Sequence, residues 1–445
     1  MATTPAPTLP IPAAGAALND ILGKDCPVVL GLLSQLGKRF YFPAKGILSQ
    51  GAEAAAKAKR YNATIGIATD DKGPIHLACV HDSFAAGMNP KDLYTYAPSY
   101  GKMELRQAWQ AKQRHETPSL GAHPISLPVV TNALTHGLSL VGDLFLDPGD
   151  EVLVTDQMWE NYPLCWETRI GAKVSTFPLF DKLLTGFNQT AFIQALAERK
   201  GRQLMVVLNF PNNPTGYSPT RAEAGAIVEA LKAAAHVGSK LVVLCDDAYY
   251  GMFFADECER ESLFGRLAQA HENLLAVKVD GATKEEFVWG LRVGFLTYGV
   301  KNGTAAAYGV LEQKTAGLIR STVSNISHAS QTIVLKALTH PDFRAQQAEK
   351  VAILRQRAAR TAIECRMPAY ADCWDVYPFN AGYFMCIRVK GVDADRLRLH
   401  LLDAHQLGVI ALGPTDLRVA FSCLLESQIA DVFARIAEGI RTLRG

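Results

Sequence analysis

The residues with the clearest chemical potential are a lysine and an arginine that lie eight positions apart. Lys284 ends the segment Asp-Gly-Ala-Thr-Lys after an apolar run, and Arg292 lies in Gly-Leu-Arg-Val-Gly. A strand that ends in small residues can present an amine at the carboxyl edge of a sheet, where open α/β sheets bind ligands. Such an amine could hold an aldehyde cofactor as an imine, and the planar guanidinium could bind a phosphate. A lysine in a loop is otherwise an ordinary solvated charge, so this interpretation needs support from other segments.

Three further segments supply polar groups at the ends of apolar, strand-like runs. Asn213 lies in Asn-Phe-Pro-Asn-Asn-Pro-Thr-Gly, a stretch that also suits a plain strand-to-helix turn. Asp246 and Tyr249 follow the next apolar run, and Arg418 interrupts a strand-like run near the C-terminus. If these strands share one sheet, all four side chains can face the same cleft.

These residue types fit the chemistry of pyridoxal phosphate. The pyridine ring withdraws electrons only while its nitrogen stays protonated, which requires a nearby buried carboxylate, and Asp246 suits that role. Asn213 and Tyr249 can donate hydrogen bonds to the phenolate oxygen of the ring. Lys284 can form the imine and then move the substrate proton.

With these motifs, over roughly residues 60 to 425, the chain resembles the fold type I pyridoxal-phosphate aminotransferases of class I/II, which include aspartate and aromatic aminotransferases. The resemblance implies an α/β fold, with a large domain around a mostly parallel central sheet and a smaller α+β domain. It also implies a catalytic set of Lys284, Asp246 and Tyr249. It further implies that Asn213 binds the phenolic oxygen, Arg292 binds the phosphate and Arg418 binds the substrate α-carboxylate.

Weaker matches extend the predicted cofactor site. Ala133, Leu134 and Thr135 open a helical pattern, and they resemble the family's phosphate cup because helix N-termini bind anions. The same turn could simply cap an ordinary helix. Trp159 resembles the aromatic residue that stacks on the pyridine ring, although a single tryptophan is also common in a core or an interface.

Three residues are predicted to involve the substrate or a second subunit. Tyr96 resembles a tyrosine that reaches the phosphate of the neighbouring subunit, and Gly66 lies in a segment that resembles the one meeting the substrate. Arg320 resembles the arginine that crosses the dimer interface to bind a distal carboxylate; otherwise it ends a surface helix or braces the interface. Gly281 departs from the family pattern, which has a phosphate-binding serine there, and Thr283 is a candidate to compensate.

Composition indicates an ordinary globular enzyme. The chain has 445 residues, of which 49% are hydrophobic and 20% are charged, and its net charge of +2 gives no reason to expect nucleic acid or a membrane surface as a partner. Nine scattered cysteines suggest neither a disulfide framework nor a metal site, so we expect a reducing, cytoplasmic location. The first residues lack a signal-peptide pattern, and no run approaches the ~18 apolar residues of a membrane span.

Strand and helix patterns alternate along the chain without repeats. Thr220 and Glu223 form a predicted capping box for a helix that stops near Gly238, and a long helix is predicted over 345–365. The predicted divisions are a flexible leader over 1–20, an N-terminal part of the small domain over 21–65, a large cofactor-binding domain over 66–328 and a small domain over 329–445.

The predicted activity is a ping-pong amino transfer between an L-amino acid, either aspartate/glutamate or aromatic, and a 2-oxo acid such as 2-oxoglutarate. The predicted assembly is a homodimer with shared active sites. A lyase or decarboxylase on the same scaffold is the main alternative. A ligand-sensing module without activity is the other, although the short Pro- and Ala-rich leader leaves no room for a fused DNA-binding domain.

Overall fold

The computed structural model describes residues 9–25, 33, 35–39, 46–64, 66–84 and 88–445. Residues 1–8 of the predicted leader therefore lie outside the described residues. Its later part differs from the expectation, because helix α1 (Ala13–Asp25) includes residues that were expected to be flexible. Asn19 on α1 donates to the carbonyl of Lys38 on α3 (Gln35–Arg39) at 2.9 Å, so contacts with a later helix hold α1 in place.

A seven-stranded sheet lies at the centre of the described part of the chain, in the order β4-β10-β9-β8-β7-β5-β6. Strand β10 is antiparallel to β4 and β9, and the pairs from β9 to β6 are parallel, so the predicted mostly parallel sheet is confirmed. The strands are β4 (Val129–Asn132), β5 (Glu151–Thr155), β6 (Lys173–Phe177), β7 (Gln203–Asn209), β8 (Lys240–Asp246), β9 (Leu274–Gly281) and β10 (Val293–Val300).

The two faces of this sheet pack against different helices because side chains alternate along each strand. On β9, Val277 and Val279 belong to the same apolar core as helix α8 (Ala133–Phe145). Leu274 and Ala276 belong to a second core, with α10 (Gln189–Ala197) and α11 (Arg221–His236). Polar residues at the strand ends follow the same alternation, which decides the side on which each one lies.

Helix α11 begins and ends where the sequence predicts. Thr220 accepts from the amide of Glu223, while the Glu223 carboxylate accepts from the amide of Thr220 at 2.7 Å, so the predicted capping box is confirmed. The helix ends at His236 and strand β8 starts at Lys240. This short connection brings Asp246 to the carboxyl edge of the sheet.

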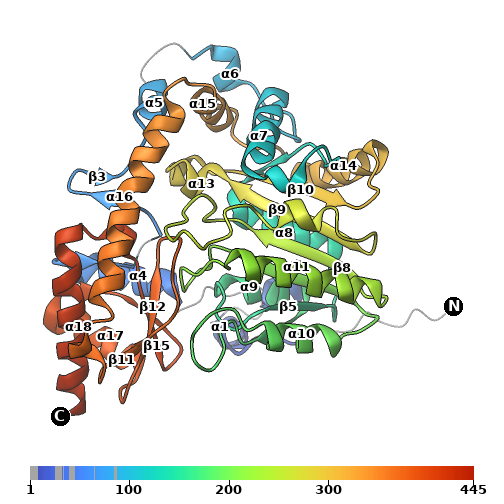
Figure 1. Ribbon diagram of the computed structural model, residues 1–445. Coiled ribbons are helices and arrows are strands. Elements are labelled where there is room, and N and C mark those ends of the chain that lie inside the picture. The colour runs from blue at the N-terminus through green and yellow to red at the C-terminus, as the bar shows by residue number, and fades with distance from the viewer. Residues whose placement is uncertain (1–8, 26–32, 34, 40–45, 65, 85–87) are drawn as a thin grey trace.

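A second, antiparallel sheet has the order β11-β12-β15-β14. Its strands are β11 (Trp374–Val376), β12 (Met385–Val389), β14 (Ile410–Leu412) and β15 (Asp416–Val419), and its helices are α16 (Phe343–Glu364), α17 (Ala394–His405) and α18 (Ile429–Arg444). Helix α16, predicted over 345–365, runs from beside α5 and α15 toward α18 (Figure 1). Strand β1 (Tyr61–Asn62) pairs with β13 (Leu407–Gly408), so an early segment joins the C-terminal part.

Shorter elements and the remaining helices complete the described fold. They are α4 (Ile47–Lys57), β2 (Thr69–Asp70), β3 (Gly73–Pro74), α5 (Ala78–His81), α6 (Pro90–Tyr94), α7 (Met103–Glu116), α9 (Asn161–Pro163), α12 (Phe264–Leu267), α13 (Ala282–Glu285), α14 (Ala305–Thr322) and α15 (His328–Leu338). None of the described helices has both the length and the apolar character needed to cross a lipid bilayer.

Candidate active site

A cavity of about 330 Å³ lies where β7, β8 and β9 end, next to the start of α8. It brings together most of the side chains that the sequence singled out. The predicted residues in its wall are Gly66, Ala133, Leu134, Thr135, Trp159, Asn213, Asp246, Tyr249, Lys284, Arg292 and Arg418. These residues come from segments far apart in the chain, so the fold and not the local sequence creates the site.

Lys284 lies on the short helix α13, directly after β9. Its Nζ is 5.0 Å from the centre of the Tyr249 ring. Burial lowers the pKa of Lys284 from 10.5 to about 8; the charge of Asp246 opposes this shift and Arg292 adds to it. About a tenth of the amine is therefore neutral at pH 7, and this neutral form is the one that attacks a carbonyl carbon.

Asp246 ends β8 on the α8 face of the sheet and is 3% exposed. Its carboxylate accepts from the Tyr162 hydroxyl at 2.5 Å and from the amide of Ala248 at 3.2 Å. Burial raises the pKa of Asp246 from 3.8 to about 6, against the lowering effects of the Tyr162 hydrogen bond and the Lys284 charge. A buried carboxylate that forms no ion pair with the described residues is suited to pair with a protonated ring nitrogen.

The neighbouring Asp247 cannot take that role. Alternation along the chain turns it to the opposite face of the sheet, where it forms an ion pair with Lys278 and accepts from Ser262 at 2.6 Å. Asp247 is absent from the cavity wall. Of these two adjacent carboxylates, only Asp246 faces the cavity.

Arg418 and Asn213 form a hydrogen-bonded pair on another side of the cavity. Arg418 Nη1 donates to Asn213 Oδ1 at 3.0 Å, and Nη2 donates to the carbonyl of Thr64 at 3.0 Å. The guanidinium lies over the Phe384 ring at 4.2 Å, and burial lowers the pKa of Arg418. Among the described residues the hydrogen-bond acceptors of Arg418 are an amide and a carbonyl oxygen and not a carboxylate, and its Nε has no acceptor. This buried cation is therefore available to a ligand carboxylate.

The part of the site that is predicted to bind phosphate is built from backbone as well as side chains. Ala133 and Arg292 both have left-handed φ values, 58° and 54°, and the Ala133 amide donates to the Arg292 carbonyl at 3.1 Å. Non-glycine residues adopt this conformation only when surrounding contacts enforce it. The contact fixes Arg292 beside the first turn of α8, whose amides have no acceptor within the helix and attract anions.

The glycine that departs from the family pattern has a steric reason. A Cβ at Gly281 would lie 2.8 Å from Gly294 Cα and from the carbonyl oxygen of Val293, so the backbone of β10 excludes a serine side chain. Thr283, the predicted substitute, lines the cavity, and its buried hydroxyl has no partner among the described residues. The donors present therefore fit a phosphorylated pyridine aldehyde without a serine at this position.

Sequence reasoning missed several residues of the site. Tyr162 holds Asp246 and packs edge-on against Trp159 at 5.7 Å; its spacing of three residues from Trp159 was the available signal. Trp289 and Phe384 line the cavity without any signal in their local sequence. These aromatic side chains make much of the wall apolar.

Two predicted residues lie away from the cavity of their own chain. Tyr96 is 89% exposed, and Arg320 is exposed on α14, where it donates to the Ser324 hydroxyl. Neither lines the cavity. The roles predicted for both require a second copy of the chain, so they stay predictions.

Comparisons with known proteins identify the family and the fold of the chain. The sequence profile of the family described as aminotransferase class I and II matches residues 69–436, so the chain belongs to that family. It is 28% identical to the arginine–pyruvate transaminase of Pseudomonas aeruginosa over 77% of this chain and 78% of that one. It is 27% identical to the tyrosine aminotransferase of Klebsiella pneumoniae over 82% and 89% of the two chains. The crystal structure of an aminotransferase from Anaerococcus prevotii has the same fold, with a TM-score of 0.81, 23% identity and coverage of 92% and 98%.

Proposed function

We propose that this aminotransferase binds pyridoxal 5'-phosphate in the cavity and transfers an amino group from an L-amino acid to a 2-oxo acid. The observation that carries the proposal is the pair formed by Lys284, whose pKa is lowered to about 8, and the buried Asp246, in one cavity with a phosphate-binding turn. When bound, the cofactor supplies an electron sink for the bonds at the substrate Cα.

The residues of the cavity wall then have defined tasks toward the cofactor. Asp246, held by Tyr162, keeps the ring nitrogen protonated, and Asn213 and Tyr249 donate to the ring oxygen. Arg292 and the α8 amides bind the phosphate, while Trp159 covers the ring. The Lys284 amine takes the proton from the substrate Cα as a general base. The resulting ammonium then donates this proton as a general acid.

The substrate is held by a different set of residues. Arg418 binds the α-carboxylate, since it is a buried cation whose hydrogen-bond acceptors among the described residues include no carboxylate, and Gly66 lies in the same wall. Trp289 and Phe384 form apolar walls that suit an aromatic donor. An acidic donor or 2-oxoglutarate needs a further cation, for which Arg320 of a second copy is our candidate, and this makes the enzyme a homodimer with shared sites.

The proposed reaction type is supported by the relatives, and the proposed location by the cysteines. The relatives compared above are transaminases, which favours transfer over elimination or decarboxylation. The seven buried cysteines that the structure describes are free thiols, which supports a reducing, cytoplasmic location.

A donor panel tests the proposal directly. Purified enzyme loaded with pyridoxal phosphate is mixed with single amino acids, and we expect a true donor to convert the absorbance of the bound cofactor without ammonia release and to form the matching 2-oxo acid in equal amount. Borohydride reduction and peptide mapping should place the cofactor on Lys284, and Lys284→Ala should lose nearly all turnover. Cofactor attached to another lysine, or full activity in Lys284→Ala, contradicts the assignment.

A further inference from the structure

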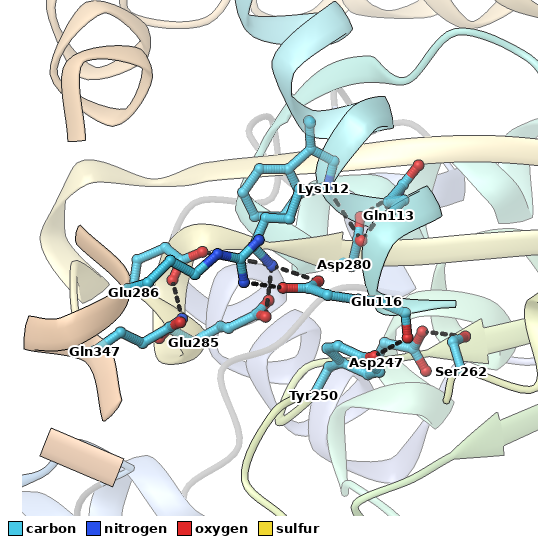
Figure 2. Close-up of polar contacts among 12 residues, drawn as sticks. Lys112, Gln113, Glu116, Asp247, Tyr250, Ser262, Asp280, Glu285, Glu286 and Gln347 are labelled. Atoms are coloured by element: carbon cyan, nitrogen blue, oxygen red, sulfur yellow. Dashed lines mark hydrogen bonds and ion pairs between the residues drawn. The ribbon is translucent and has the colours of Figure 1, made fainter. Parts of the chain in front are cut away.

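A buried cluster of charged and polar residues adjoins the segment that carries Lys284 but lies outside the cavity wall. It consists of Lys112 and Glu116 on α7, Glu285 and Glu286 directly after Lys284, and Gln347 on α16; we call it the lysine-turn cluster. Figure 2 shows these five side chains pointing toward one another. None of them takes part in the function proposed above.

Lys112 is the centre of the lysine-turn cluster. Its Nζ lies 2.5 Å from Glu285 Oε1, 2.8 Å from Glu116 Oε2 and 3.5 Å from Glu286 Oε1, with its side chain 5% exposed. It also lies over the Trp109 ring at 4.6 Å. One ammonium thus connects α7 to both residues that follow the reactive lysine.

Gln347 connects the same turn to α16. The first part of this helix packs on the core of the seven-stranded sheet, through Phe343 and Leu354, and its later part packs on the core of the antiparallel sheet, through Ala358. Gln347 Nε2 donates to the main-chain carbonyl of Glu285 at 3.1 Å and to Glu286 Oε2 at 2.9 Å. Tyr383, just before β12, donates through its hydroxyl to the carbonyl of Lys284 at 3.0 Å. Three consecutive residues, beginning with Lys284 itself, are therefore held by groups on α16, on α7 and before β12.

The cluster contains buried charged groups, and each of them requires a partner at a fixed position. Burial raises the pKa of Glu286 to about 7 and that of Glu285 well above its usual value. Although burial acts to lower it, the surrounding carboxylates raise the pKa of Lys112. Replacing buried ion pairs by apolar residues is often neutral or favourable for stability, so stability alone does not account for such a cluster, whereas fixed geometry does.

We propose that Gln347 and Lys112 are positioning residues for Lys284. They fix the turn that carries the amine and, through α16, couple the position of Lys284 Nζ to the half of the molecule built around the antiparallel sheet. This inference rests on the proposed function only in taking Lys284 as the reacting amine.

The test compares two adjacent glutamines on α16. Gln347→Leu removes both hydrogen bonds to the turn. Gln346→Leu is the matched control, because Gln346 Oε1 accepts from the amide of Cys79 at 2.9 Å, away from the turn. Trace acetylation of the cofactor-free, full-length chains between pH 6 and 10, read by mass spectrometry at the Lys284 peptide, measures the reactivity and pKa of that amine.

We expect Gln347→Leu to change the Lys284 labelling rate at pH 8 by about threefold or more, and to lower kcat on the order of tenfold with little change in KM, because small misplacements of a reacting group are costly. Gln346→Leu should match the parent in both. Equal labelling of Lys284 in the two variants, or a fall in thermal stability without any change in labelling, overturns the proposal.

A second pair of variants covers the case in which Gln347→Leu does not fold. Gln347→Asn keeps the amide but shortens its reach, and Glu286→Gln keeps the shape and removes one charge; each should shift the Lys284 labelling profile relative to Gln346→Leu. Unchanged profiles in both overturn the proposal. Labelling needs no substrate, so it remains informative if no amino acid proves to be a donor. If the parent enzyme does transaminate but labelling of Lys284 is unchanged in the variants, only the positioning role is contradicted.

Discussion

Substituting Asp246 by asparagine should make the cofactor-free protein more stable and the loaded enzyme much slower. The structure places this carboxylate in a buried position, where Tyr162 and the amide of Ala248 donate to it and no cation among the described residues forms an ion pair with it. Burial raises its pKa from 3.8 to about 6, a shift of about two units. At about 1.36 kcal/mol per unit, the ionised form destabilises the folded chain by roughly 3 kcal/mol.

The pH dependence follows from the sign of this shift. The folded chain binds the proton of Asp246 more tightly than the unfolded chain does, so stability is greatest below pH 3.8 and is lost as the pH rises to about 6. Asparagine keeps an acceptor for Tyr162 and has no charge. The stability gained by Asp246→Asn should therefore grow between pH 4 and pH 6, reach about 1–3 kcal/mol, and stay constant above that.

Thermal unfolding of cofactor-free protein at several pH values measures this difference. We expect Tm of Asp246→Asn to exceed that of the parent by a few degrees at pH 8 and by little at pH 4. Asp247→Asn is the matched control; it should lower Tm at pH 8, because it leaves the buried Lys278 with only the more distant carboxylate of Asp280, at 3.5 Å.

The loaded enzyme should respond in the opposite direction. If Asp246 has the proposed role at the ring nitrogen, losing its charge should reduce kcat about 10²-fold or more, which corresponds to about 3 kcal/mol. A Tm difference that does not change with pH refutes the burial argument. Transamination at the parental rate by Asp246→Asn refutes the assignment of this residue to the ring nitrogen.

Three other substitutions test separate parts of the site. Gly281→Ser should lower stability by about 1–3 kcal/mol and weaken cofactor binding, since its Cβ would meet β10 backbone atoms at 2.8 Å; Gly225→Ser, where a Cβ meets nothing within 4 Å, is the control, and equal Tm values would contradict the steric argument. Tyr162→Phe removes a hydrogen bond that lowers the Asp246 pKa, so the pH window over which Tm of the cofactor-free protein falls should extend upward by less than about one unit; an unchanged window would show that this hydrogen bond does not tune the carboxylate. Arg320→Ala should reduce kcat/KM for aspartate or glutamate at least about tenfold more than for phenylalanine or tyrosine. Equal losses for both donor classes, in a variant with the same oligomeric state as the parent, would assign Arg320 to structure.

Local patterns were sufficient for the parts of the site that lie on single strand ends. Lys284, Asp246 and Asn213 each follow an apolar strand, and parallel strands that share a sheet place their carboxyl ends at one edge, so their convergence could be expected from order and spacing. The capping box at Thr220 and the long helix α16 were equally local and were predicted near their observed bounds.

The remaining parts of the site depend on which distant segments meet. Phe384 packs under Arg418 from a loop before β12, and Tyr162 reaches Asp246 from α9; nothing in either local sequence specifies these partners. The early helix α1 was missed for the same reason, because its alanine- and glycine-rich sequence resembles a leader until its contact with α3 is known.

The lysine-turn cluster shows why a charge pattern alone is a poor guide at such sites. Glu285 and Glu286 stand next to a lysine in the sequence, where two consecutive acidic residues normally indicate an exposed turn. The fold instead buries both and supplies Lys112 from α7 and Gln347 from α16 as their partners. Because an unpaired buried carboxylate is strongly unfavourable, moving the turn away from these partners would be costly. Once their partners are known, these two carboxylates therefore indicate which groups hold the turn that carries Lys284.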